Sequence, residues 1–144
     1  MSGLHDWVPE LDALAGQGLL LTHFLANGID TEAGLISLLS GEPALARGDT
    51  KTVFQPFEAP KNSLPRMLAD NGWRTAFLTT GDLDFLDKGR WLGDIGFQLV
   101  EGDDAAFYKG MKRYHFDAAP DAALFDRALQ FLAQRGSTDA APLS

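Results

Sequence analysis

Apolar and polar positions follow one another along the chain in the order expected of strands and helices. The run LLLTHFLA at residues 19–26 is continuously apolar at its start, which is typical of a strand covered on both faces in a parallel sheet. The turn pair Asn27-Gly28 comes next. In residues 32–40 the leucines and the isoleucine recur at helical spacing, and Gly41 is a suitable stop. The pattern predicts a strand, a turn and a helix in succession.

The same alternation continues through the rest of the chain. Apolar spacing and proline, serine and glycine positions predict helices at 9–16, 63–72 and 120–136, a loop running into a helix at 80–96, strands at 74–80 and 97–102, and a helical turn at 103–107. Ser63 is expected to cap the helix that it precedes. Residues 42–62 contain several prolines and no periodicity, which predicts an irregular surface loop, and residues 137–144 form a tail. Alternating strands and helices indicate an α/β fold with a parallel sheet.

Composition limits the classes of partner. The 144 residues, of which 45% are apolar, suffice for one domain with a core. Twelve basic residues stand against 20 acidic ones, and this net charge of -8 argues against nucleic acid as a partner. The absence of cysteine excludes disulfides and thiolate metal sites. No apolar run reaches the roughly 20 residues that span a bilayer, and the N-terminus lacks a signal-peptide pattern, so the sequence read alone predicts a cytoplasmic protein.

One hydroxyl is placed where anion chemistry is possible. Thr31 lies between two carboxylates, Asp30 and Glu32, at the start of the helix predicted for 32–40. Unpaired backbone N–H groups and the positive end of the helix dipole attract phosphate and sulfate there, and a nearby divalent cation would lower the pKa of the hydroxyl. The simpler explanation is that Asp30 or Thr31 is an N-cap. Local spacing leaves both explanations open.

Two longer motifs carry a family resemblance. The run VPELDALAGQGLLLTHFLANGIDTEAGLISLLSGEP resembles the nucleophile-bearing segment of sulfatase-type domains in the alkaline phosphatase superfamily, in the lipoteichoic acid synthase and phosphoglycerol transferase branch. The later run SLPRMLADNGWRTAFLTTGDLDFLDKGRWLGDIGF is similar to further motifs of that branch, in the same order. The resemblance covers residues 8–136. It implies an alkaline phosphatase-like α/β fold, present as a partial parallel-sheet sandwich truncated at both ends.

The resemblance also implies an activity. Thr31 matches the family nucleophile, which is also a metal ligand, in phosphoryl or sulfuryl transfer that depends on a divalent metal such as Mn, Zn or Mg. The implied partners are a small phosphate or sulfate ester or a lipid head group, and family members are membrane-anchored with the catalytic domain outside the cytoplasm. The family's upstream acidic ligand and downstream Asp-His pair have no counterpart in this chain. We therefore expect the chain to bind no metal and to be inactive alone.

Other polar residues are weaker candidates. Asp82 and Asp84 follow the strand predicted at 74–80, where α/β sheets present substrate-binding groups, although aspartate is also ordinary turn chemistry. His23 is expected to be hydrogen-bonded within its strand rather than bound to a metal. A basic stretch could face an anionic substrate or could be a solvated loop, and it comprises Lys109, Lys112, Arg113, Tyr114 and His115.

Two functions remain as alternatives to a fragment of an enzyme. The first is a non-catalytic α/β module that binds an anion or a protein, and the second is a truncated gene product without its own function. Open sheet edges predict self-association in each case.

Overall fold

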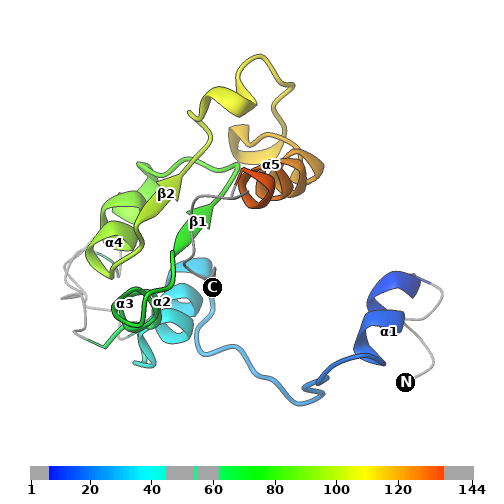
Figure 1. Ribbon diagram of the computed structural model, residues 1–144, viewed down its shortest axis with the longest axis vertical. Coiled ribbons are helices and arrows are strands. Elements are labelled where there is room, and N and C mark those ends of the chain that lie inside the picture. The colour runs from blue at the N-terminus through cyan, green and yellow to red at the C-terminus, as the bar shows by residue number, and fades with distance from the viewer. Residues whose placement is uncertain (1–6, 45–53, 55–61, 135–144) are drawn as a thin grey trace.

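The computed structural model describes residues 7–44, 54 and 62–134, and within them it contains helices and one short two-stranded parallel sheet (Figure 1). In chain order the elements are α1 (Pro9–Ala15), α2 (Thr31–Ser40), α3 (Leu64–Asp70), β1 (Ala76–Leu78), η1 (Phe85–Asp87), α4 (Lys88–Asp94), β2 (Leu99–Glu101), η2 (Ala106–Tyr108), η3 (His115–Asp117) and α5 (Asp121–Ala133). The α/β class is confirmed. The expected tail at 137–144 and most of the loop at 42–62 lie outside the described residues.

The sheet is a β1–α4–β2 unit. The two strands are parallel, and Ala76, Phe77 and Leu78 lie opposite Leu99, Val100 and Glu101. Parallel strands need a crossover between them, and α4 supplies it and packs against β2. Both strands fall inside the ranges predicted from the sequence, 74–80 and 97–102. The expected parallel pairing is therefore confirmed.

The main core lies between α2 and α4. Its buried members are Ile36, Leu39, Phe54, Trp91, Leu92 and Ile95. The rings of Phe54 and Trp91 stack with centroids 4.7 Å apart. Phe54 is only 1% exposed, so the expectation of a surface loop over 42–62 is wrong at this position. Packing against Trp91 removes the apolar ring of Phe54 from water, which stabilises the folded chain more than an exposed ring would.

Helix α2 begins and ends as the sequence indicates. The Asp30 carboxylate accepts a hydrogen bond from the Ala33 N–H at 2.8 Å, and Gly41 ends the helix with a left-handed φ of 72°. Gly28, before the helix, has a φ of 138°, and a Cβ placed there would lie 2.4 Å from the Ala33 Cβ. Only glycine allows the chain to enter α2 along this path.

The strand predicted at 19–26 is absent from the structure. Residues 19–30 run as an extended segment between α1 and α2, and α1 lies apart from the other elements (Figure 1). Leu19, Phe24 and Leu25 are 88%, 70% and 87% exposed. A strand is defined by its hydrogen-bonded partner, and within the described residues β1 and β2 pair only with each other. The apolar run therefore has strand composition without a strand's pairing.

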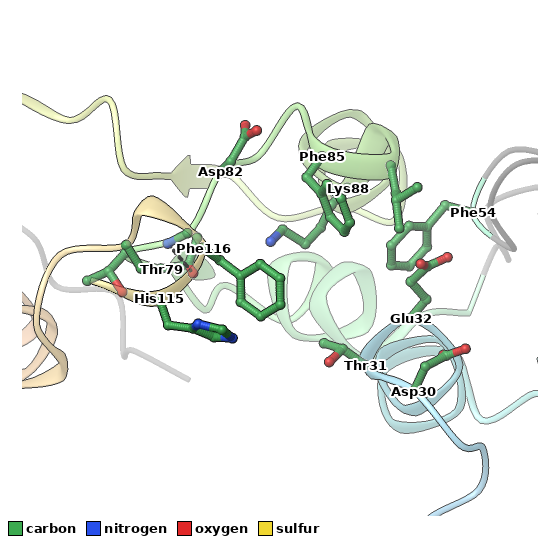
Figure 2. Close-up of a pocket in the computed structure, with 14 residues that line it drawn as sticks. Asp30, Thr31, Glu32, Phe54, Thr79, Asp82, Phe85, Lys88, His115 and Phe116 are labelled. Atoms are coloured by element: carbon green, nitrogen blue, oxygen red, sulfur yellow. Dashed lines mark hydrogen bonds between the residues drawn. The ribbon is translucent and has the colours of Figure 1, made fainter. Parts of the chain in front are cut away.

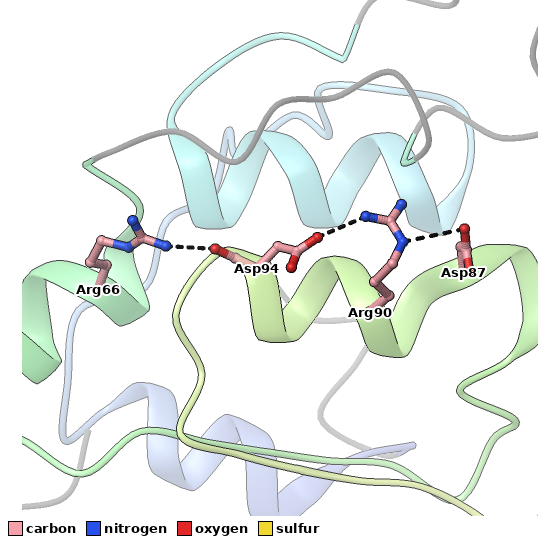
Figure 3. A network of polar contacts seen from close by, with 4 residues as sticks. All are labelled: Arg66, Asp87, Arg90 and Asp94. Atoms are coloured by element: carbon pink, nitrogen blue, oxygen red, sulfur yellow. Dashed lines mark hydrogen bonds and ion pairs between the residues drawn. The ribbon is translucent and has the colours of Figure 1, made fainter.

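Helices α3 and α4 are joined by polar contacts. Ser63 does not cap α3 as expected, because its hydroxyl donates instead to the carbonyl of Ile95. Arg66 Nη2 donates to the Asp94 carbonyl at 2.6 Å, and the Arg90 guanidinium contacts the carboxylates of Asp94 and Asp87 at 2.7 and 3.4 Å (Figure 3). The bonds from Ser63 and Arg66 join α3 to the end of α4, whereas the Arg90 contacts lie within the segment 87–94.

Helix α5 is attached by a second cluster and an ion pair. Tyr108, Ala119 and Ala123 are buried together. Arg127 donates from Nε and Nη2 to the two carboxylate oxygens of Glu101, at 2.6 and 2.7 Å. This hydrogen bonding raises the pKa of Arg127 above its ordinary value, so the guanidinium stays charged. The pair connects α5 to the end of β2.

Candidate active site

A cavity of about 560 Å³ opens at the head of α2. Its walls come from the first turn of α2, the loop after β1, the start of α4 and the η3 turn. The lining residues are Asp30, Thr31, Glu32, Phe54, Thr79, Thr80, Gly81, Asp82, Phe85, Leu86, Lys88, His115, Phe116 and Ala118. Segments distant in the sequence therefore meet around the residue that the motif selected.

Thr31 is the first residue of α2 and is exposed in this cavity. Its side chain is directed toward the rings of His115 and Phe116, whereas the Asp30 carboxylate is turned away from them (Figure 2). Asp30 already caps the helix. Among the described residues, none forms a hydrogen bond with the Thr31 hydroxyl. The capping explanation therefore applies to Asp30 and leaves Thr31 available to a ligand.

Lys88 contributes a positive charge from the opposite wall. It is the first residue of α4, and its ammonium group reaches into the cavity (Figure 2). A Cβ placed on Gly81 would lie 3.9 Å from Lys88 Nζ, so the loop after β1 passes directly beside it. Lys88 forms no ion pair with any residue in the described ranges. A cation in this position suits an anionic ligand.

The predicted candidates divide into those that reach the cavity and those that do not. Asp82 lines it, but its carboxylate points away from Thr31 (Figure 2). Asp84 lies outside the lining, and its N–H donates to Asp82 Oδ1 at 2.7 Å, which is turn chemistry. His23 lies in the extended segment, 3.0 Å from the Thr22 hydroxyl, and not in a strand as expected.

The residues of the basic stretch also differ in whether they reach the cavity. His115 lines the cavity. Arg113 instead donates to the carbonyls of Asp103 and Asp117, at 2.9 and 3.3 Å. Lys112 lies over the Tyr114 ring at 5.1 Å. Only the end of this stretch is placed to contact a ligand.

Lys88 and Phe116 line the cavity although neither is a candidate from the sequence alone. Lys88 lies in the segment predicted as a loop followed by a helix. Its position at the start of a helix that follows a strand is the signal that could have identified it. Phe116 follows the basic stretch and carries no local signal. Its place in the same cavity as Thr31 depends on the conformation of the η3 turn.

The described residues do not form a metal site by themselves. Within residues 7–44, 54 and 62–134, no three His, Asp or Glu side chains gather closely enough to hold an ion. Of the two carboxylates adjacent to Thr31 in sequence, that of Asp30 accepts a hydrogen bond from the Ala33 N–H. The side chains present therefore do not fit a divalent cation unaided, and no reaction step is assigned to one.

The fold and the motifs define the class. A family model described as Sulfatase matches residues 2–140. The chain therefore belongs to the sulfatase family, as the motifs around Thr31 indicate. No curated protein sequence matches the chain significantly.

A solved structure shows the same fold. The chain is similar to the crystal structure of the lipoteichoic acid synthase LtaP from Listeria monocytogenes, with a TM-score of 0.77 and 19% identity. The similarity covers 94% of this chain and 33% of that one, so the chain spans about a third of the length of this relative. The expected partial alkaline phosphatase-like fold is confirmed. In the part of the chain that is described, no helix is long and apolar enough to cross a membrane.

Proposed function

We propose that this chain carries the nucleophile-bearing part of a sulfatase-like phosphotransferase or hydrolase site. The observation that carries the proposal is the position of Thr31, exposed at the head of α2 in a cavity while Asp30 performs the capping. Membership of the sulfatase family and the likeness to LtaP support it. The substrate class is a phosphate or sulfate ester, with phosphoglycerol as the head group suggested by the resemblance.

The chemistry uses few groups of this chain. The Thr31 oxygen forms a bond to phosphorus or sulfur while the bond from that atom to the ester oxygen breaks, and the proton lost by the Thr31 hydroxyl is taken up by the departing alcohol. Water or an acceptor alcohol then releases the group from Thr31. Lys88 and the first-turn N–H groups of α2 offset the negative charge of the bound ester. The metal dependence expected of the family needs ligands other than those described.

The isolated chain is expected to be inactive. The measurement is turnover of a chromogenic phosphate ester and a chromogenic sulfate ester, each with Mn²⁺, Zn²⁺ or Mg²⁺. The rate should equal that of a Thr31→Ala variant, because Thr31 is the only residue of the family's metal site that the resemblance places in this chain. A reproducible Thr31-dependent rate would show an active enzyme and overturn the expected inactivity.

An anion-binding module is the second candidate, and Lys88 favours it. A lysine without an ion-pair partner in the described ranges, set opposite a helix N-terminus, can hold phosphate or sulfate without catalysis. Titration with inorganic phosphate, followed by amide NMR shifts, should move the first-turn signals of α2. Lys88→Gln should abolish the shifts, whereas Lys112→Gln should not, because Lys112 lies outside the cavity. Absence of binding would remove both candidates and leave a chain without its own function.

A further inference from the structure

Two strained turns border the cavity. Leu86 and Asp87 have φ values of 59° and 66°, and Phe116 and Asp117 have values of 55° and 56°. A left-handed conformation costs a residue other than glycine roughly 1 kcal/mol, and such strain often accompanies ligand sites. One residue of each pair, Leu86 and Phe116, lines the cavity. Both turns therefore hold an apolar side chain at the same opening.

The η3 turn is closed by its own hydrogen bonds. The Tyr114 N–H donates to the Ala118 carbonyl at 2.9 Å, and the Asp117 N–H donates to the Tyr114 carbonyl at 3.1 Å. Arg113 also donates to the Asp117 carbonyl. These bonds fix the backbone on both sides of Phe116. The turn thus fixes the direction in which the Phe116 side chain leaves the backbone.

The Phe116 side chain is 83% exposed. Its ring contacts only one neighbouring aromatic ring among those described, that of His115, with centroids 4.3 Å apart. In Figure 2 the Phe116 ring lies between the Lys88 ammonium group and Thr31. Phe85, 59% exposed, stands on the wall formed by η1. The space between Lys88 and Thr31 is therefore flanked by exposed aromatic rings.

We infer that the cavity selects anionic esters whose alcohol part is a flat apolar ring, with Phe116 as the specificity-determining residue. The inference rests on the proposed function, because the anion must first be held near Lys88 and Thr31. A ring on the ester oxygen would then stack on Phe116, as aromatic pairs prefer. A polyol such as glycerol would leave that face exposed. Aryl phosphates or sulfates are thus favoured over the phosphoglycerol suggested by the resemblance.

The test compares three ligands on the full chain by calorimetry and NMR. Phenyl phosphate should bind about tenfold more tightly than glycerol 3-phosphate or inorganic phosphate, the advantage expected of one stacked ring. Phe116→Ala should remove most of that preference and leave the affinity for inorganic phosphate unchanged. Phe116→Asn should do the same while retaining the turn, because asparagine tolerates the left-handed conformation. Phe125→Ala is the control, since Phe125 is exposed on α5 outside the cavity.

The outcomes separate the two claims. Phosphate binding that depends on Lys88, together with equal affinity for all three ligands, would overturn the aryl preference and leave the proposed function standing. A phenyl preference unaffected by both Phe116 variants would also overturn the inference. If none of the ligands binds, or if Lys88→Gln changes nothing, the anion site itself is wrong and both claims fall.

Discussion

Replacing Arg127 should strongly destabilise the attachment of α5. Both Nε and Nη2 of Arg127 contact the Glu101 carboxylate, and the two side chains are only 14% and 15% exposed. Arg127→Met keeps most of the side-chain volume but leaves a nearly buried carboxylate without its partner. Removing one member of a buried pair costs about 3–5 kcal/mol. The residual exposure of Glu101 places our expectation at the lower end, about 3 kcal/mol.

The assay is urea unfolding followed by circular dichroism. Arg127→Met should lower the transition midpoint with little change in the denaturant slope, and it should lower the melting temperature by about 10 °C or more. The double variant Glu101→Met with Arg127→Met should recover most of the loss, because an apolar pair of similar size leaves no buried charge. The matched control is Arg90→Met, whose ion pairs are about half exposed and should contribute no more than about 1 kcal/mol.

Two results would refute this reasoning. A loss below about 0.5 kcal/mol in Arg127→Met would show that the pair is as screened as an ordinary surface pair. A double variant less stable than the single one would show that the side chains contribute through packing and not through charge. Arg127 lies over the Phe107 ring at 5.9 Å, so Arg127→Lys separates the two contributions by retaining charge without the bidentate contact.

Three further expectations concern Gly28 before α2, the buried hydroxyl of Tyr108 and the exposed segment 19–29. Gly28→Ala should destabilise the chain by more than about 2 kcal/mol in urea unfolding, because the added methyl group would clash with Ala33. Gly34→Ala, which has open space around it, should instead stabilise α2 by up to about 1 kcal/mol. Equal effects of the two variants would contradict this account. Burial raises the pKa of Tyr108, so its contribution to stability should be complete below pH of about 10 and decline above it; Tyr108→Phe should flatten the stability profile there, and an unchanged alkaline profile would disprove the assignment. The exposed apolar residues of 19–29 should make the chain self-associate, so light scattering and melting should depend on protein concentration, and a concentration-independent monomer that melts above ~60 °C would contradict the expectation.

Helix α2 and the parallel strands could be predicted because their signals are local. Gly41 and the apolar spacing before it define a helix in almost any surroundings, and the ranges 74–80 and 97–102 each contain an apolar centre flanked by turn residues. The segment 19–26 shows the limit of this reasoning. Its composition is that of a buried strand, yet a strand also needs a paired neighbour, which composition does not supply.

Of the candidates named from the sequence, Thr31, Asp82 and His115 line the cavity. The prediction for Thr31 depended on the motif around it. That motif is contiguous, so both the helix start and the possible nucleophile could be identified from the sequence. Lys88, His115 and Phe116 come to the cavity from separate segments through the crossover and the η3 turn. The burial of Phe54 could not be predicted either, because the ring on which it stacks, that of Trp91, is distant in the sequence. Such convergence is a property of tertiary packing, and periodicity carries no information about it.

The β1–α4–β2 crossover has a consequence for how the cavity assembles in time. Thr75 and Gln98, hydrogen-bonded at the base of the two strands, are 23 positions apart, so closing this unit requires only a modest loop. Contacts that are close in sequence form faster than distant ones. The wall that carries Lys88 can therefore form early, whereas α2 must come from much farther along the chain to cover Trp91 and Leu92. We expect Thr31 and Lys88 to meet only in the last stage of folding, so a chain that stalls there has a formed sheet and no cavity.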